Sequence, residues 1–221
     1  GNAETHNVAV GANAGLSVTT GVQNTFIGGL AGDAATTASN NTAVGYAALT
    51  TNTTGTQNTA LGAYAGDAIT TGNHNIATGA FALGANTTGS YNVAIGRSSL
   101  EANTTASNNT AVGNHALLAN TTGAENTATG SNSQLATTTG NYNTSNGSGS
   151  LYANTTGSSN VAIGLNALVA NTTASNNTAV GTFALTANTT GARQTSVGAR
   201  SGMQNTTGNY NAFFGYDAGE S

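Results

Sequence analysis

Residues 177–193 read Asn-Thr-Ala-Val-Gly-Thr-Phe-Ala-Leu-Thr-Ala-Asn-Thr-Thr-Gly-Ala-Arg, and this stretch of 17 residues is the unit from which the chain is built. Its first five residues, an Asn-x-Ala-Val-Gly pentapeptide, return in related form every 17 residues without insertion or deletion. The copies begin at Asn7, Asn24, Asn41, Asn58, Asn75, Asn92, Asn109, Asn126, Asn143, Asn160, Asn177, Gln194 and Asn211. A strict period of this length predicts a solenoid in which each repeat forms one coil.

The constancy of the interval is explained by stacking, because one inserted residue would break the register between coils. We therefore predict an all-β fold, a parallel β-solenoid or β-roll of thirteen 17-residue coils that forms a single elongated domain over residues 1–221. A longer repeat, Thr-Thr-Ala-Ser-Asn-Asn-Thr-Ala-Val-Gly, occurs at 36–45, 104–113 and 172–181, four coils apart each time. Growth by such blocks favours a repeated surface over a single active site.

Each coil contains two segments with the composition of short strands. Residues 177–180 form the first, and Gly181 closes it at a point that requires positive φ or a close backbone approach. The second is expected to end at Thr189-Thr190, after which Gly191 turns the chain toward the next coil.

The two faces of the first strand differ in side-chain size. Its central residue is Ala or Ser in nearly every coil, as at Ala43, Ala60 and Ala77, and this row predicts a narrow interior. The flanking Val, Ile and Leu side chains would then point outward as an apolar stripe, which predicts self-association with closed symmetry. The alternative is that this stripe fills a wider interior and the Ala row faces solvent. The predicted self-association residues are Val44, Leu61, Val93, Ile95, Val112, Val161, Ile163 and Val180.

The composition argues against several classes of partner. Charged residues are 5% and hydrophobic residues 37% of the chain, and the three cations are all Arg, so no basic surface for nucleic acid or anionic lipid is expected. No apolar run approaches the length of a membrane-spanning helix, so this segment is not expected to insert into a membrane. The total length equals thirteen repeats, which would keep head-to-tail stacking in phase.

The Asn residues fall into two groups by position in the coil. Those that head the pentapeptides predict a ladder of amides that bond from coil to coil and to turn backbone. A second group heads Asn-Thr-Thr sequons, which are either glycan acceptors or a product of the Asn-rich and Thr-rich composition. The candidate acceptors are Asn52, Asn86, Asn103, Asn120, Asn154, Asn171, Asn188 and Asn205.

Aromatic residues recur at two turn positions of the coil. Tyr64, Phe81 and Phe183 share one, and Tyr91, Tyr142 and Tyr210 share the other. These six side chains are candidates for recognition of glycans or partner surfaces, and the alternative is that they cover turn backbone.

No catalytic or metal-binding constellation is recognisable. His6 and His74 share a coil position four coils apart, there is no Cys, and no Ser lies in a nucleophile-elbow motif. Asp33 and Asp67 occupy matching positions two coils apart, too distant to share one calcium ion. We therefore expect no enzymatic activity and no catalytic residue. We also expect no metal site and no cofactor.

Asn40-Asn41-Thr42-Ala43-Val44-Gly45, and more closely Asn92-Val93-Ala94-Ile95-Gly96, resemble the Asn-Ser-Val-Ala-Ile-Gly repeats of trimeric autotransporter adhesin heads and related phage tail-fibre repeats. The resemblance covers essentially the whole chain. It implies a left-handed parallel β-roll, a homotrimer, and binding to host or matrix surfaces. These coils are longer than that family's usual repeat, and the added length lies around the Asn-Thr-Thr-Gly segment.

These observations predict a non-catalytic structural or adhesive component of an extracellular, cell-surface fibre or filament. Its expected partners are copies of itself, as a trimer or a head-to-tail filament, together with a host, matrix or glycan surface. One alternative is a receptor-binding segment of a virion tail fibre. Another is an ice-binding solenoid, because Thr-Thr pairs from Thr19-Thr20 to Thr206-Thr207 would place one outward Thr in each of twelve coils.

Overall fold

The structure is a computed structural model that describes residues 5–219, and within them it contains thirteen parallel β-strands of three residues each and no helix. The strands are β1 (Val8–Val10), β2 (Thr25–Ile27), β3 (Thr42–Val44), β4 (Thr59–Leu61), β5 (Ile76–Thr78), β6 (Val93–Ile95), β7 (Thr110–Val112), β8 (Thr127–Thr129), β9 (Thr144–Asn146), β10 (Val161–Ile163), β11 (Thr178–Val180), β12 (Thr195–Val197) and β13 (Ala212–Phe214). The chain divides into two compact units, unit 1 ending at Asn108 and unit 2 beginning at Asn109.

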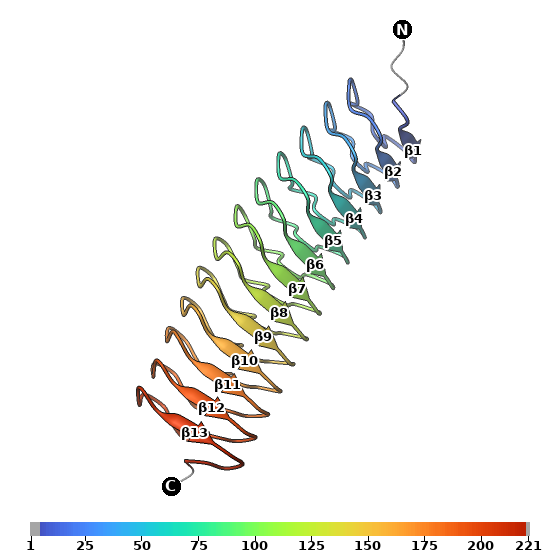
Figure 1. Cartoon of the computed structure of the whole chain (residues 1–221). Helices are drawn as coiled ribbons and strands as arrows, with labels where there is room; N and C mark the ends of the chain where they lie inside the picture. The colour runs from blue at the N-terminus through green and yellow to red at the C-terminus, as the bar shows by residue number, and fades with distance from the viewer. Residues whose placement is uncertain (1–4, 220–221) are drawn as a thin grey trace. The chain divides into compact units, whose positions relative to one another are not determined.

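Within each unit the strands pair in chain order, β1 to β6 in unit 1 and β7 to β13 in unit 2, and every pair is parallel (Figure 1). The register equals the sequence period: Ala43 lies opposite Ala60, and Val44 opposite Leu61. This arrangement confirms the predicted all-β parallel solenoid with one strand per 17-residue coil. The expected single domain over residues 1–221 stays a prediction.

The glycine that ends each pentapeptide is required by both conformation and space. Gly45 has φ of 139°, and a β-carbon there would lie 2.5 Å from the carbonyl oxygen of Gly62 in the next coil. Stacking therefore brings backbone so close to backbone that a side chain has no room, as the sequence predicted.

The second extended segment of the coil is not a strand. The Thr-Thr pairs lie in bends, and the amides of Thr53, Thr54 and Gly55 all point to the carbonyl oxygen of Thr70, at 3.1, 3.3 and 3.4 Å. Three donors that converge on one acceptor curl the backbone, so a ladder of alternating bonds cannot form there. The expectation of a second short strand in each coil, ending at the Thr-Thr pair, was therefore wrong, since each described coil contributes one strand only.

The corners of the coil adopt left-handed backbone conformation at three positions, often without glycine. In the coil that begins at Asn41 these are Ala47, Leu49 and Gln57, with φ of 55°, 51° and 58°. Each such residue costs about 1 kcal/mol relative to the right-handed region. Stacking of identical corners supplies the opposing hydrogen bonds, such as the Ala47 amide to the Gly29 carbonyl at 2.9 Å.

The core consists of two rows of side chains inside the coils. Central strand residues such as Ala43 and Ala60 are fully buried, and so is the left-handed corner residue Leu49. Where the strand carries a large residue, the corner residue is small. Phe26 packs against Gly32, and a β-carbon added to Gly32 would lie 2.5 Å from the Phe26 ring. In this coil the large strand residue thus fills the space that the small corner residue leaves.

The Asn that heads each coil forms the predicted ladder. Asn75 is buried, and its hydrogen bonds are made within the protein. Its backbone amide donates to Oδ1 of Asn58 at 3.0 Å, and its side-chain Nδ2 donates to the carbonyl oxygen of Gly89 at 2.9 Å. Its own Oδ1 accepts from the Asn92 amide at 3.0 Å. Because a buried polar group is stabilising only when it is satisfied, this row of paired amides both closes the coil and fixes its neighbour.

Candidate association and recognition surfaces

The strand face of each unit presents aliphatic side chains to solvent. In β6 and β10 the central Ala94 and Ala162 are fully buried, whereas Ile95 and Ile163 are 41% and 40% exposed. The Ala row therefore lines the interior and the flanking row points outward, as predicted; the alternative with Ala facing solvent is wrong. Of the predicted self-association residues, Leu61, Ile95 and Ile163 are exposed, and Val44, Val93, Val112, Val161 and Val180 are half-buried.

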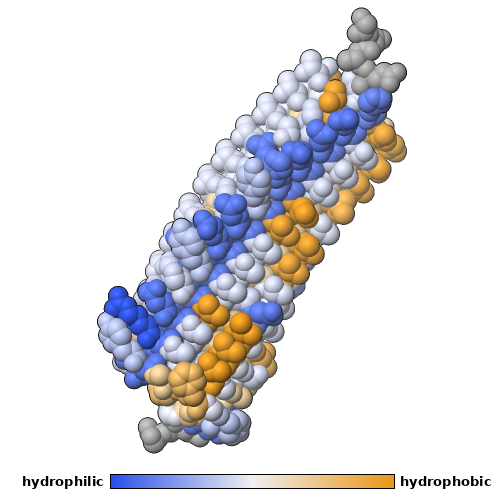
Figure 2. Space-filling view, viewed as in Figure 1, coloured by the Kyte–Doolittle hydropathy of each residue, from blue (hydrophilic) through white to orange (hydrophobic). Residues whose placement is uncertain are grey.

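The apolar stripe is continuous in unit 1 and interrupted in unit 2. Every strand from β1 to β6 points at least one Val, Ile or Leu outward, whereas β8 and β9 point only Thr127, Thr129, Thr144 and Asn146. On the face seen in Figure 2, apolar residues form orange patches separated by white and blue. The expectation of a contiguous stripe is therefore corrected for unit 2. None of the thirteen strands carries a charged residue.

Seven of the eight candidate glycan acceptors are fully buried. Asn103 is typical: its Nδ2 donates to Oδ1 of Asn86 at 2.9 Å and to the carbonyl of Ala106 at 3.1 Å. The acceptors with no exposed surface are Asn52, Asn86, Asn103, Asn120, Asn154, Asn171 and Asn188. Glycosylation of these nitrogens is incompatible with the fold, so the glycan prediction is wrong for them, and only Asn205 is partly exposed. A feature that was not predicted is that some of these amides bond from coil to coil, Asn103 to Asn86 and Asn188 to Asn171.

Three aromatic rings form a stack on unit 1. Tyr64 and Phe81 are parallel, with ring centroids 5.4 Å apart and an interplanar angle of 3°, and Tyr46 meets Tyr64 edge to face at 5.4 Å. Tyr46 was not among the predicted recognition residues because it lies one position earlier in its coil. Since the rings cover one another's faces, they present mainly their edges to solvent, which favours a role in holding adjacent corners together.

The second aromatic position behaves in the same way. Tyr91 stacks on His74 with centroids 4.8 Å apart, and Tyr210 lies under the guanidinium of Arg193 with 5.4 Å between the guanidinium carbon and the ring centroid. Tyr142 is 60% exposed. The last predicted recognition residue, Phe183, is half-buried. The six candidates are thus distributed over both units and do not converge on one pocket.

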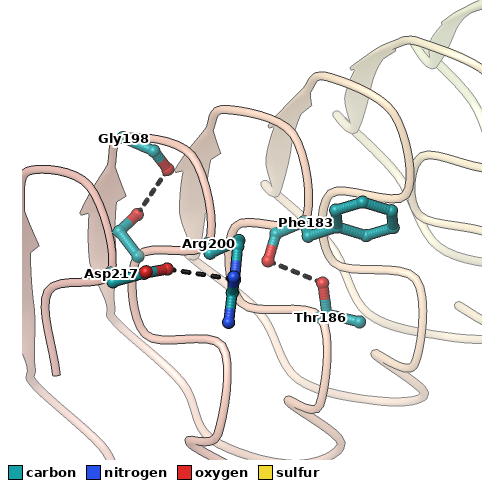
Figure 3. A network of polar contacts seen from close by, with 6 residues as sticks. Phe183, Thr186, Gly198, Arg200 and Asp217 are labelled. Carbon is teal, nitrogen blue, oxygen red and sulfur yellow. Dashed lines mark hydrogen bonds and ion pairs between the residues drawn. The ribbon is translucent and has the colours of Figure 1, made fainter. Parts of the chain in front are cut away.

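Polar contacts at the corners of unit 2 are also satisfied within the protein. Figure 3 shows Arg200 directed at Asp217 of the following coil, with 3.0 Å between Nε and Oδ1. In the same view the Thr186 hydroxyl donates to the carbonyl oxygen of Phe183 at 2.6 Å. The Ser201 hydroxyl donates to the carbonyl oxygen of Gly198 at 2.8 Å. These contacts stabilise stacked corners and leave no preorganised nucleophile and base pair among them.

A column of acids lies on unit 1. Asp33, Asp67 and Glu101 share one coil position, and only the two Asp residues had been predicted to align. Asp67 and Glu101 flank Gly84, where a β-carbon would lie 3.6 Å from Oδ1 of Asp67 and 3.7 Å from Cγ of Glu101. Partial burial raises the pKa of the Asp67 carboxyl, and the negative charge of Glu101 raises it further. Hydrogen bonds from the backbone amides of Asp67 and Ala68 act in the opposite direction and lower this pKa. Thr50 donates its hydroxyl to Asp33 at 2.7 Å.

Residues 5–219 contain no group of three or more His, Cys, Asp or Glu side chains placed to hold a metal ion. Over the same range no helix is long and apolar enough to span a bilayer. Comparisons of the chain with protein-family models, with curated proteins and with solved structures give no match.

Proposed function

We propose that this chain is a non-catalytic structural segment of an extracellular surface fibre and that its copies associate side by side through the strand face of the solenoid. The observation that carries the proposal is the uncharged strand face of unit 1, on which Leu61, Ile76 and Ile95 each keep about two-fifths of their surface in water. Aliphatic side chains repeated at every coil amount to an exposed patch of the kind that marks an interface.

Repetition makes this face self-complementary. Coils in a parallel ladder are about 4.8 Å apart, so identical rows on two copies meet in register over many coils at once. Each coil contributes little, but the contributions add because one docking event aligns all of them. Closed rotational symmetry buries such a face without leaving an open edge, and a trimer is the arrangement implied by the resemblance to adhesin heads.

The polar strands β8 and β9 set a limit on this association. Their outward residues Thr127, Thr129, Thr144 and Asn146 offer hydroxyl and amide groups, which gain little from burial unless they are paired. We therefore assign the main contact to unit 1 and to the coils of unit 2 from β10 onward.

The test is a double substitution on the strand face, Leu61→Lys with Ile95→Lys, measured by light scattering and sedimentation velocity at micromolar concentration. Buried lysines repel one another across a symmetric contact, so this variant is expected to be monomeric when the unsubstituted protein is oligomeric. The matched control is Thr71→Lys with Thr105→Lys, which changes the same two coils on another face and should leave the mass unchanged. Equal masses for both variants and the unsubstituted protein would overturn the proposal.

A further inference from the structure

A column of threonines with unused hydroxyl groups runs along each unit. In unit 1 it comprises Thr20, Thr37, Thr54, Thr71, Thr88 and Thr105, and in unit 2 Thr122, Thr139, Thr156, Thr173, Thr190 and Thr207. We call these residues the outer threonine column. All twelve are exposed, and within residues 5–219 none of their hydroxyls makes a hydrogen bond to the protein. The head Asn side chains and the inner threonine of each pair are bonded to the neighbouring coil, whereas the hydroxyls of the outer column are available to a ligand.

The backing of this column is rigid. The threonine that precedes each outer one is half-buried over most of the chain and donates its hydroxyl to the carbonyl oxygen of its counterpart in the next coil. Thr36 bonds Thr53 at 3.0 Å in unit 1, and Thr138 bonds Thr155 at 3.1 Å in unit 2. Together with the backbone donors that converge on the same carbonyls, these bonds hold the outer threonines at the coil spacing of about 4.8 Å.

The chemistry of the column favours one kind of ligand. In all twelve coils the residues on either side of the Thr-Thr pair are uncharged, and the following residue is Gly or Ala throughout. The outer column contains no aromatic, Arg or Met side chain, which are the usual anchors of protein contacts. A rank of hydroxyl and methyl groups at a fixed interval, without ions that would order water around themselves, suits an ordered lattice of water molecules.

We propose that the outer threonine column binds ice. The hydroxyls hydrogen-bond water at the crystal surface, the methyl groups lie in contact with it, and the rigid backing avoids ordering these side chains at the moment of binding. Each coil adds one weak contact, and the sum over a unit resists detachment. This activity goes beyond the proposed fibre function and is independent of it, because the column and the strand face occupy different positions of the coil.

The experiment measures thermal hysteresis and the shape of single ice crystals in a nanolitre osmometer, with ice itself as the probe. The unsubstituted protein is expected to shape ice and to depress its growth temperature. Thr71→Lys with Thr105→Lys, which places two bulky cations in the column of unit 1, should reduce that depression while circular dichroism shows the fold unchanged. Thr71→Ser with Thr105→Ser, which keeps the hydroxyls, should lose less.

The strand-face variant Leu61→Lys with Ile95→Lys is the control for this experiment, and it should retain ice shaping even as a monomer. The absence of hysteresis and of shaping in the unsubstituted protein would overturn the inference, as would an equal loss in both Lys variants. Because the oligomer mass is measured on the same four samples, failure of ice binding is distinguishable from failure of the fibre proposal.

Discussion

At the scale of single residues, the fold depends on glycine positions where an added β-carbon would clash with the backbone of the next coil. Gly28 has φ of 132°, and a β-carbon on it would lie 2.4 Å from the carbonyl oxygen of Gly45. The neighbouring Gly29 is different, because a β-carbon there would make an ordinary contact, 3.5 Å from the Tyr46 ring. Of these two adjacent glycines, Gly29 can therefore be replaced by Ala without a clash and Gly28 cannot.

We predict that Gly28→Ala lowers the free energy of unfolding by at least about 2 kcal/mol, because it combines an unfavourable φ with a backbone clash. Gly29→Ala should change it by less than about 0.5 kcal/mol, as surface substitutions usually do. Urea denaturation followed by circular dichroism measures both values. Similar free energies of unfolding for the two variants would show that close stacking of the pentapeptide glycines is not what excludes a side chain at residue 28.

A second residue-scale prediction concerns Asp67. Its pKa is raised in the folded chain, so the ionised carboxylate destabilises the fold at pH values above the folded pKa. The destabilisation is relieved as the pH falls through the folded pKa, and it is gone below the ordinary value of 3.8. Asp67→Asn should therefore raise the melting temperature at pH 7 and have less effect near pH 3. Glu125→Gln removes the charge of an exposed acid and serves as the control. A lower melting temperature for Asp67→Asn at pH 7 would contradict this assignment.

At the scale of the coil, what is conserved is volume and not residue type. Six of the thirteen coils place Ala on the strand and Leu at the corner, as at Ala43 and Leu49, whereas the coil before that one has Phe26 and Gly32. In unit 2 the interior next to β8 and β9 is polar instead: Gln134 donates its Nε2 to the Ser145 hydroxyl at 2.9 Å. That region has no aliphatic side chain on the outside of its strands either, so it contributes least to burial of apolar surface.

Exchange of one packing solution for the other is a direct test. Phe26→Ala should cost about 3–5 kcal/mol because it empties the interior of its coil. Adding Gly32→Leu recreates the pair seen at Ala43 and Leu49, and should recover a large part of that loss, since the corner already has the left-handed conformation that Leu49 adopts. Additive losses in the double variant, determined by thermal or urea unfolding, would contradict volume compensation within the coil.

The sequence predicted the coil length, the register, the parallel pairing, the buried Ala row and the Asn ladder, because each follows from a residue type repeated at a fixed position. It did not predict the left-handed corners at Leu49 or Tyr64, since Leu and Tyr have no intrinsic preference for positive φ and adopt it only because stacked neighbours bond the same corner. It also assigned Thr53-Thr54 to a strand on β propensity, whereas convergent hydrogen bonds make it a bend.

The candidate surfaces were predicted with mixed success for a related reason. A motif such as Asn103-Thr104-Thr105 is an acceptor only when its Asn is exposed, and exposure depends on the opposite side of the coil. The stacked rings of Tyr64 and Phe81 likewise depend on the next coil, not on their own. Periodicity gives the positions that share a row, and only the folded coil gives the direction in which each row points.

At the scale of the whole molecule, we propose that the uncharged strand face with its exposed Ile and Leu side chains is covered by other copies of the same chain. The most direct measurement is the mass in dilute solution by light scattering coupled to size-exclusion chromatography. One chain has a mass of 21.4 kDa. We predict a discrete mass of three chains, or a larger multiple if trimers join end to end. A single species of one-chain mass at micromolar concentration would contradict the account.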